Sequence, residues 1–528
     1  MRDFFQPGRS AIAATQAAIA TSHPLATAAG LAVLREGGNA VDAALAAIAV
    51  QCVVEPHMTG IGGDCYVLYA PNGGDVVALN GSGRSCAAAS ADRLRHAGLT
   101  EISQTSAHAV TIPGAVSAWT KLHGDHGSLA LDRLFSAAIG YAENGYPVTA
   151  RVASDWKAAE ASLADDVGTA GTFLVDGHTP QAGQRHSQPR LADRLKEIAR
   201  DGAAAFYLGK TARSMARCLR ERGGVHTEED FAEGLHGAEY VTPISTEYRG
   251  YQVLECPPNG QGIAALMILN ILEGFELPPG MAPADRTHLH AEATKLAYRH
   301  RDALIADPGC LAYPAHTLLD AKTTSTLRRR VSMNTARPGT LWDEPEHEDT
   351  VYVSVVDAAG NAVSFINSLF HGFGSKILDP ETGILLHSRG SSFRLVEGHP
   401  NELAPRKRPM HTIIPGMLRK NGLTVMPFGV MGGHYQAAGQ AALLSGILDR
   451  RLDLQAAIDA PRAFSFNDLL EVEPTFDTST IERLQKLGHR VRIAERPLGG
   501  AQAIWIDHRA GLLWGASDPR KDGCALGF

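Results

Sequence analysis

The chain has 528 residues, of which 44% are hydrophobic and 20% are charged, and its formal net charge is −7. A chain of this length and composition can bury a large core, and the length permits several domains without choosing their number. Acidic and basic residues are interspersed rather than gathered into a basic face, so we expect no nucleic-acid partner.

Cysteine use and the first residues favour a cytoplasmic protein. The seven cysteines are scattered without a CxxC pair or metal-type spacing, which predicts reduced and mostly buried thiols. The N-terminal residues include an acid and a proline where a signal peptide has its apolar stretch. Charged and polar residues interrupt the alanine-rich run that ends at Val54, so we expect no membrane span.

The N-terminal part predicts two helices and a hairpin. From Pro24 to Val54 the apolar residues recur at helical spacing, and Gly37-Gly38 breaks the pattern. We therefore expect two buried, closely packed helices joined at a glycine stop. Short strands at Tyr66 to Tyr69 and Val76 to Leu79 flank the turn sequence Pro71-Asn72-Gly73-Gly74 and predict a β-hairpin.

The middle of the chain, from about Gly114 to Arg330, predicts a helical layer. Amphipathic segments such as Leu191 to Ile198 and Thr287 to Leu304 alternate there with proline and glycine turns. Between Arg328 and Glu348 the periodicity fails, and polar residues, glycine and proline take over. Such a segment suits a linker that awaits cleavage.

From Thr350 onward the hydrophobic period changes to two, which predicts a second hairpin. A three-residue loop, Ala358 to Gly360, with glycine where a positive φ is needed, pairs Asp357 with Asn361. With that register Thr350 lies opposite Ser368, so two hydroxyl groups from different strands meet on one face of a sheet. Further strands are expected at Ile384 to Leu386, Ile413 to Leu418, Leu423 to Pro427 and Ala503 to Ile506.

A threonine that starts a strand after a flexible segment can become an N-terminal nucleophile. A hydroxyl needs a base to take its proton, and an N-terminal threonine carries one in its α-amine, with an unperturbed pKa of about 7.7–8.0. Cleavage of the chain would supply that amine, and the segment from Glu346 to Thr350 fits the requirement. Taken alone, an Asp-Thr step is usually just the start of a strand.

Ordered motifs extend along most of the chain. They are Ser22-His-Pro, Gly37-Gly-Asn-Ala-Val-Asp-Ala43, Glu55-Pro-His, Gly60-Ile-Gly-Gly63, Pro113-Gly114, Pro257-Pro258, Asp349-Thr-Val-Tyr-Val-Ser-Val-Val-Asp357, Gly360-Asn-Ala-Val363, Gly383-Ile-Leu-Leu386, Lys407-Arg-Pro409, Gly432-Gly433, Ala460-Pro-Arg462 and Gly515-Ala-Ser-Asp-Pro-Arg520. Together they resemble the γ-glutamyltransferase family of N-terminal nucleophile hydrolases from roughly Ser22 to Asp522.

The resemblance implies a fold, a maturation step and an assembly. The fold is an α+β four-layer αββα sandwich with an extra helical layer. Self-cleavage between Asp349 and Thr350 gives a large chain, residues 1–349, and a small chain, residues 350–528. These form a heterodimer, which could pair into a dimer of heterodimers, and no metal or organic cofactor is implied.

The same resemblance assigns catalytic roles. Thr350 matches the nucleophile, and Ser368 matches the family's second threonine, which hydrogen-bonds the nucleophile's hydroxyl. Gly432 and Gly433 match the oxyanion hole, in which backbone N–H groups stabilise the tetrahedral intermediate. Without the family these two glycines would be read as a plain β-turn.

The sequence departs from the family where glutathione-cleaving members hold the glutamyl group. Those members bind the α-carboxylate with an arginine and paired serines, and the α-ammonium with an acidic residue and amides. Ser392 replaces the acidic residue, Arg389 replaces the glutamine before it, and Phe370 replaces an asparagine. The positions of the paired serines and the early arginine hold His411, Thr412 and Ser82, although Arg84 could reach the same space.

These departures favour a smaller acidic amide as substrate. Arg389 can bind a carboxylate by a two-pronged contact, while Phe370 and His411 fill volume that a glutamyl side chain would need. Oxamate amidohydrolases of purine (uric acid) breakdown are family members with such pockets. The leading hypothesis is therefore hydrolysis of oxamate through a Thr350 acyl ester, which releases ammonia and then oxalate.

Several alternatives stay open. The enzyme could be a γ-glutamyl hydrolase or transpeptidase, or a β-lactam side-chain acylase, or the chain could be an unprocessed binding protein. Arg389 could form a surface ion pair with Glu381 or Asp379, and Phe370 could be simple core. Gly60-Ile-Gly-Gly63 follows a helix and is not a dinucleotide motif.

The sequence gives only weak support for a metal-binding site. On a helix, only His288 and Glu292 of the trio His288, His290 and Glu292 share a face, and no third partner is evident. We therefore expect an ordinary surface helix there.

Overall fold

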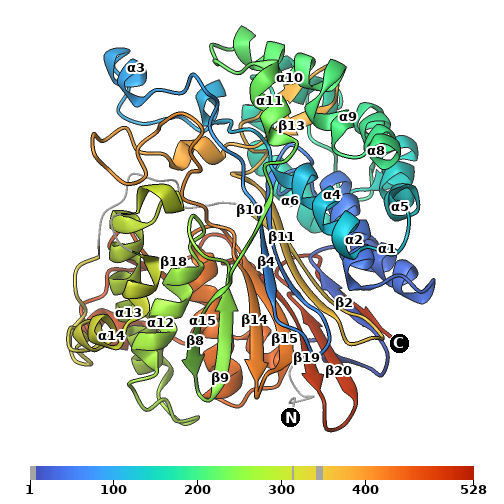
Figure 1. The fold of residues 1–528 in the computed structure, drawn as a ribbon. Coiled ribbons are helices and arrows are strands. Elements are labelled where there is room, and N and C mark those ends of the chain that lie inside the picture. The colour runs from blue at the N-terminus through green and yellow to red at the C-terminus, as the bar shows by residue number, and fades with distance from the viewer. Residues whose placement is uncertain (1–7, 312–313, 340–348) are drawn as a thin grey trace.

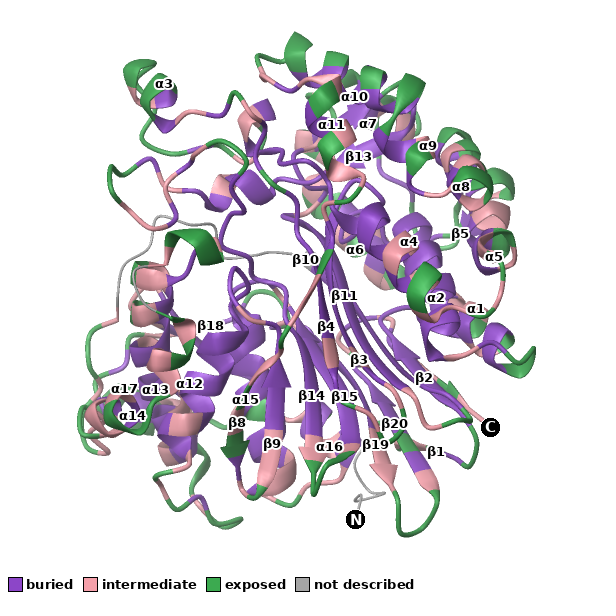
Figure 2. Cartoon of the chain, viewed as in Figure 1, coloured by how far each residue is buried: buried purple, intermediate pink, exposed green. Residues whose placement is uncertain are grey.

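The structure, a computed structural model, describes residues 8–311, 314–339 and 349–528 (Figure 1). Two seven-stranded antiparallel sheets lie face to face in the middle of the molecule, and helices cover the outer side of each. The strands are almost wholly buried where the two sheets meet (Figure 2). The predicted α+β sandwich of four layers is confirmed.

The first sheet contains the predicted N-terminal hairpin and the hairpin that begins at Thr350. Its strands are, in spatial order, β21 (Cys524–Gly527), β2 (Ala18–Thr21), β10 (Asp349–Val356), β11 (Ala362–Phe370), β3 (Asp64–Ala70), β4 (Val77–Gly81) and β7 (Glu239–Val241).

The second sheet is built mostly from the C-terminal third of the chain. Its strands are, in spatial order, β1 (Ile12–Ala14), β20 (Leu512–Ser517), β19 (Gly500–Asp507), β15 (Leu423–Met431), β14 (Pro415–Lys420), β9 (Tyr251–Glu255) and β8 (Ile244–Tyr248).

Helices cover both outer faces, and on the side of the first sheet a further layer lies outside them (Figure 1). The first sheet is covered by α1 (Pro24–Arg35), α2 (Ala40–Val54) and α4 (Ala115–His126), with α5 (Leu131–Asn144) and α8 (Pro189–Asp201) beyond. The second sheet is covered by α12 (Gly262–Leu272), α15 (Tyr435–Leu448) and α16 (Leu454–Asp459), with α13 (Pro283–Leu304) outside α12.

The remaining helices and strands lie between or beside these elements in the chain. They are α3 (Ala91–His96), β5 (Tyr146–Pro147), α6 (Ala150–Leu163), α7 (Val167–Phe173), β6 (Arg185–His186), α9 (Ala204–Tyr207), α10 (Gly209–Glu221), α11 (Glu228–Gly234), α14 (Ala321–Arg328), β12 (Ile377–Asp379), β13 (Ile384–Leu386), β16 (Ala463–Phe466), β17 (Leu469–Val472), α17 (Thr478–Lys486) and β18 (Val491–Ile493).

The predicted helix pair at the N-terminus is confirmed. Gly37 has a φ of 90° and ends α1, while Asn39 and Asp42 form a capping box that starts α2. A Cβ on Gly30 would lie 2.9 Å from the carbonyl oxygen of Ala43, so the two helices approach more closely than a larger residue permits. Every residue of α2 is buried, which fits its nearly uniform apolar sequence.

The register of the β10–β11 hairpin is as predicted. Val351 pairs with Asn367, the N–H of Asp357 donates to the carbonyl of Asn361 at 3.0 Å, and Gly360 has a φ of 83°. The register shifts by one residue between Asp349 and Val351, so a bulge lies where the strand begins. This irregularity is beside Thr350.

The middle of the chain forms the predicted helices but is not helical throughout, because β7, β8 and β9 lie between residues 239 and 255. The strands β8 and β9 are joined by a tight turn in which Arg249 and Gly250 both have positive φ. The strand predicted from Ile413 begins only at Pro415, because the N–H groups of Ile413 and Ile414 donate to the side chains of His411 and Gln436 instead.

Three further expectations concern the cysteines, a membrane span and the helix around His288. All seven cysteines are free and five are buried, while Cys310 is exposed. Within the described ranges, no helix has the length and apolar character needed to cross a membrane. The surface helix expected around His288 was wrong in its burial: His288 and Glu292 are both 0% exposed. Residues 340–348 of the proposed linker lie outside the described residues.

Candidate active site

The predicted pair of hydroxyl groups is present at the start of β10. Thr350 is 1% exposed, and its Oγ1 lies 3.1 Å from the Oγ of Ser368 on β11. The Nε2 of Gln436, near the start of α15, lies 3.5 Å from the same Oγ1. A buried hydroxyl with a hydroxyl and an amide beside it is held in one orientation, as a nucleophile needs to be.

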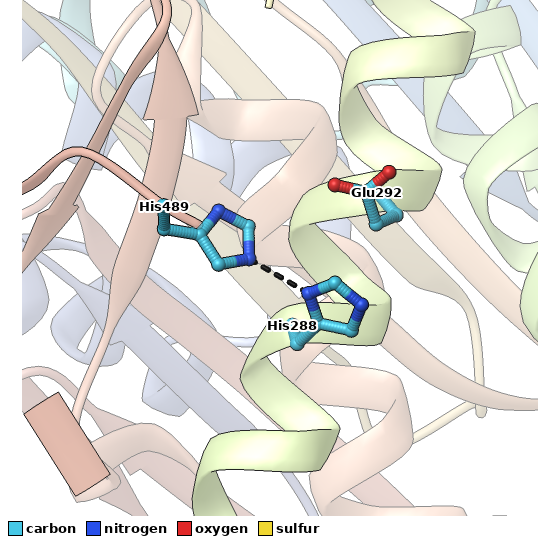
Figure 3. A group of neighbouring side chains, drawn as sticks. All are labelled: His288, Glu292 and His489. Atoms are coloured by element: carbon cyan, nitrogen blue, oxygen red, sulfur yellow. Dashed lines mark hydrogen bonds between the residues drawn. The ribbon is translucent and has the colours of Figure 1, made fainter. Parts of the chain in front are cut away.

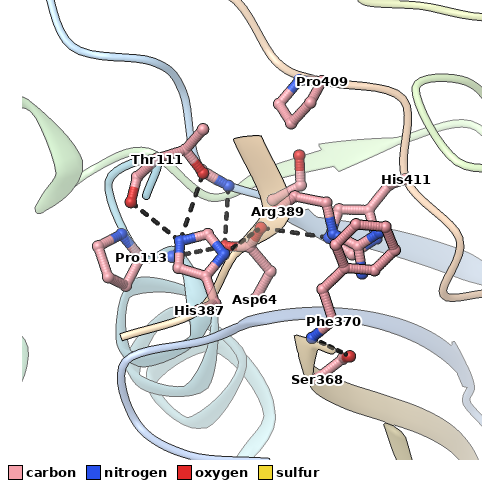
Figure 4. A network of polar contacts seen from close by, with 12 residues as sticks. Asp64, Thr111, Pro113, Ser368, Phe370, His387, Arg389, Pro409 and His411 are labelled. Carbon is pink, nitrogen blue, oxygen red and sulfur yellow. Dashed lines mark hydrogen bonds and ion pairs between the residues drawn. The ribbon is translucent and has the colours of Figure 1, made fainter. Parts of the chain in front are cut away.

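Ser368 also contacts Phe370 through its hydroxyl group. The Oγ of Ser368 accepts a hydrogen bond of 2.9 Å from the N–H of Phe370, whose φ is 82° (Figure 4). A bulky residue at positive φ is rare and costs free energy, and such residues cluster at functional sites.

Arg389 lies over the ring of Phe370 (Figure 4). Its guanidinium carbon is 3.6 Å from the ring centroid, and its Nη1 donates a hydrogen bond of 3.0 Å to the Oγ1 of Thr412. Arg389 begins a short 3-10 helix, Arg389–Ser392, and is 1% exposed. The stack on Phe370 and the bond to Thr412 fix the plane of the cation.

The alternative reading of Arg389 as a surface ion pair was wrong. Glu381 pairs with Arg217 at 2.6 Å, and the carboxylate of Asp379 accepts hydrogen bonds from the hydroxyls of Ser214 and Thr382. Arg389 instead lies in the interior of the molecule.

Asp64, which the sequence did not suggest, lies next to this cation and is fully buried. It accepts hydrogen bonds from the N–H groups of Gly83 and Gly114, at 3.0 and 2.9 Å, and from the Nε2 of His411 at 3.2 Å. Burial acts to raise the pKa of Asp64, but His387, His411 and the Gly114 N–H outweigh it and lower that pKa to about 2. Asp64 is therefore a carboxylate at neutral pH.

His411 is neutral at neutral pH. Burial, with the positive charge of Arg389, lowers its pKa to about 3. A neutral imidazole that donates from Nε2 to Asp64 leaves Nδ1 as an acceptor, and Nδ1 lies 3.3 Å from the N–H of Ile413. His411 thus fills space beside the cation without adding charge.

Gly432 and Gly433 form the turn between β15 and α15. Both have positive φ, 107° and 50°, and a Cβ on Gly432 would lie 2.8 Å from the Cα of Gly499. Among the described residues, neither N–H has a hydrogen-bond acceptor. Two unbonded N–H groups at the turn that leads into Gln436 are available to an oxyanion.

Two predicted substrate-binding residues are not part of this group. The hydroxyl of Ser392 lies within hydrogen-bond distance of the carbonyls of Arg389 and Met410, so it holds the 3-10 helix in place. The side chain of Arg84 is 43% exposed and pairs with Asp307 at 3.1 Å. Nothing in these contacts supports substrate binding by Arg84 or Ser392.

Residues 26–528 match the family model described as gamma-glutamyltranspeptidase. The chain belongs to this family. The resemblance inferred from the ordered motifs is confirmed, and with it the assignment of the chain to enzymes that hydrolyse amide bonds.

Relatives within the gamma-glutamyltranspeptidase family differ in their named activities. The chain is 37% identical to the glutathione hydrolase-like YwrD proenzyme of Bacillus subtilis, over 97% of this chain and 99% of that protein. It is also 37% identical to the oxamate amidohydrolase proenzyme of Klebsiella pneumoniae, over 96% of this chain and 97% of that protein.

The fold is similar to that of a solved acylase. The cephalosporin acylase from Bacillus halodurans superposes on this chain with a TM-score of 0.94 and is 36% identical to it. The match covers 100% of this chain and 98% of the acylase chain. The named relatives thus differ in the substrates that their names state.

Among the described residues, one group of side chains has the spacing of a metal site: His288, Glu292 and His489. It shares no residue with the Thr350–Ser368 pair or with the residues around Arg389, which are Phe370, Asp64, His411 and Thr412. The prediction missed its third member, because His489 comes from a loop far along the chain.

Proposed function

We propose that the chain is a self-processing amidohydrolase that cuts itself between Asp349 and Thr350 and then uses Thr350 to hydrolyse a small amide bearing a carboxylate. The observation that carries the proposal is the buried pair of hydroxyls, Thr350 and Ser368, 3.1 Å apart. Ser368 joins this pair to Phe370, on which Arg389 is stacked.

In the processing step, the Oγ1 of Thr350 attacks the carbonyl carbon of Asp349. The peptide C–N bond breaks as the acyl group moves from nitrogen to oxygen, and the proton of the Thr350 hydroxyl passes to the nitrogen, which becomes the α-amine. Water then hydrolyses the ester, which regenerates the hydroxyl and leaves residues 1–349 and 350–528 as separate chains. The bulge at the start of β10 favours this step, because a regular strand would leave less freedom around the scissile bond.

In the turnover step, the freed α-amine takes the proton of the Thr350 hydroxyl. The oxygen attacks the substrate amide, and the N–H groups of Gly432 and Gly433 receive the negative charge of the tetrahedral intermediate. The C–N bond breaks and ammonia leaves with the proton. Water hydrolyses the resulting ester and releases the carboxylic acid.

The substrate class follows from Arg389. A buried guanidinium offers a planar two-pronged contact to a carboxylate, and Phe370 and His411 narrow the space around it. Oxamate, in which the carboxylate is bonded directly to the amide carbon, is the leading candidate. The 37% identity to an oxamate amidohydrolase proenzyme supports it, and cytoplasmic purine breakdown is the proposed setting.

Two other substrates keep support from relatives of similar identity. A γ-glutamyl amide is favoured by the glutathione hydrolase-like relative, and a cephalosporin side chain by the acylase with a TM-score of 0.94. The substrate assay described below tests both of these alternatives as well as oxamate.

The processing step is tested by intact mass spectrometry of wild type, Thr350→Ala and Ser354→Ala. Ser354 is a matched control, because it lies on the same strand, is 0% exposed and bonds to the carbonyl of Pro427 at 3.1 Å. Wild type and Ser354→Ala should give two chains, and Thr350→Ala one. An uncut wild type, or cleavage at another bond, would refute the nucleophile.

The substrate is tested by incubating mature protein with oxamate, a γ-glutamyl anilide and a cephalosporin with an acidic acyl side chain. Ammonia from oxamate alone supports the proposed pocket. Release of aniline or of the cephalosporin nucleus at a higher kcat/KM would transfer the proposal to that substrate. Gel filtration of the mature protein tests the heterodimer and its pairing into a dimer of heterodimers.

A further inference from the structure

Two histidines and a glutamate meet in the helical layer outside the second sheet (Figure 3). His288 and Glu292 lie one turn apart on α13, and His489 lies between α17 and β18. All three are buried, and one ligand atom from each lies within 4.8 Å of the others. The Nδ1 of His288 and the Nε2 of His489 are 2.8 Å apart.

The surroundings orient His288 as a metal ligand is usually oriented. Its Nε2 lies 2.6 Å from the carbonyl oxygen of Ser332, and a carbonyl can only accept, so Nε2 carries the proton. The lone pair of His288 is therefore on Nδ1, which faces His489. Metal-binding histidines almost always donate their other ring N–H to a carbonyl or carboxylate in this way.

Glu292 supplies an independent observation. Its Oε1 accepts the N–H of Arg337 at 3.1 Å and pairs with Lys295. Its Oε2 is buried, and no hydrogen-bond partner for it lies among the described residues. An unsatisfied buried carboxylate oxygen costs free energy, and it is explained when an ion is its partner.

We propose that His288, Glu292 and His489 bind one divalent transition-metal ion, with Zn²⁺ the best match to two imidazole nitrogens and one carboxylate oxygen. Zn–N bonds of about 2.0–2.1 Å at a tetrahedral angle need the two nitrogens about 3.3 Å apart. The observed pair must open by about half an ångström, which a rotation of the His489 ring can provide. In the metal-free protein the two rings share a hydrogen bond instead.

The position of the site indicates a structural role. His288 and Glu292 belong to residues 1–349, and His489 belongs to residues 350–528. The His288 ring and the Glu292 carboxylate also form hydrogen bonds with the backbone of Ser332 and Arg337, in the segment that leads toward Thr350. If the proposed cleavage occurs, the ion joins the two chains; this last role rests on the proposed function, whereas the metal site does not.

The test uses protein without a histidine tag, dialysed against a chelator and titrated with ZnCl₂. We expect one tightly bound Zn²⁺ per chain, and an affinity at least about 100-fold lower in His489→Gln and in Glu292→Gln. His290→Gln is the matched control on the same helix, and Cys310→Ser controls for the exposed thiol. Both should bind Zn²⁺ as wild type does.

A second measurement does not depend on variants that could fail to fold. A crystal of wild type soaked in ZnCl₂ should show an anomalous peak at the zinc edge between His288, Glu292 and His489. Lack of a stoichiometric ion, a peak elsewhere, or an equal loss in His290→Gln would overturn the proposal. Thr350→Ala should bind Zn²⁺ as wild type does. Zn²⁺ binding therefore tests the metal site whether or not the chain cleaves itself.

Discussion

Replacing Arg389 by lysine removes the planar cation and keeps its charge. In the structure the guanidinium lies 3.6 Å from the ring centroid of Phe370 and donates to Thr412. A lysine ammonium can reach a substrate carboxylate as a point charge, but it cannot make two parallel hydrogen bonds or stack in the same plane.

The size of the effect follows from the lost contacts. One hydrogen bond to a charged group contributes about 1.5–3 kcal/mol, and fixing a mobile lysine without the stack on Phe370 costs about 1 kcal/mol more. A total of about 3 kcal/mol corresponds to about 10²-fold in kcat/KM. Because the carboxylate is bound in both ground and transition states, most of the change should appear in KM.

The assay is ammonia release from oxamate over a range of substrate concentrations. Arg84→Lys is the control, because Arg84 is an exposed arginine whose ion pair with Asp307 contributes little. We expect Arg84→Lys to stay within about 2-fold of wild type. An Arg389→Lys enzyme with unchanged KM, or an equal loss in Arg84→Lys, would refute the carboxylate contact.

Three further predictions concern processing, packing and pH. Ser368→Ala should slow the appearance of two chains about 10²-fold on a gel time course, because the Thr350 hydroxyl loses its partner. Gly429→Ala should lower the free energy of unfolding in urea by about 1–3 kcal/mol, because the new Cβ would lie 2.3 Å from the Tyr352 ring; an unchanged midpoint would contradict the packing. Burial lowers the pKa of His186 to about 4, so unfolding takes up a proton between pH of about 6.5 and 4, and stability falls as pH falls through that window. His186→Gln should remove this part of the pH dependence, and equal slopes in both proteins would contradict it.

Local patterns predicted the parts of the site that neighbouring strands build. The contact between the Thr350 and Ser368 hydroxyls could be predicted from the alternation of two strands and a three-residue loop closed by Gly360. Gly37 likewise marked the end of a helix, because a positive φ at a helix end is a local requirement.

The rest depends on contacts between distant parts of the chain. His411 and Asp64 are 347 residues apart, and no period or motif connects them. His489 was missed as a partner of His288 for the same reason. Ser82 holds the position of the family's early arginine, and Arg84 was expected to reach the same space, but Arg84 pairs with Asp307 and its side chain is 43% exposed.

The order of strands in the first sheet has a consequence for the mature protein. The hairpin β10–β11 lies between β2 and β3, so a segment after the proposed cut is bonded on both sides to segments before it. The same alternation occurs in the second sheet, where β1 and β9 flank a block from the C-terminal part. Unfolding then separates two molecules, and refolding becomes a second-order reaction that dilution slows. If the proposed cut occurs, it replaces a fold that can re-form from one chain with a two-chain product whose lifetime depends on its rate of unfolding.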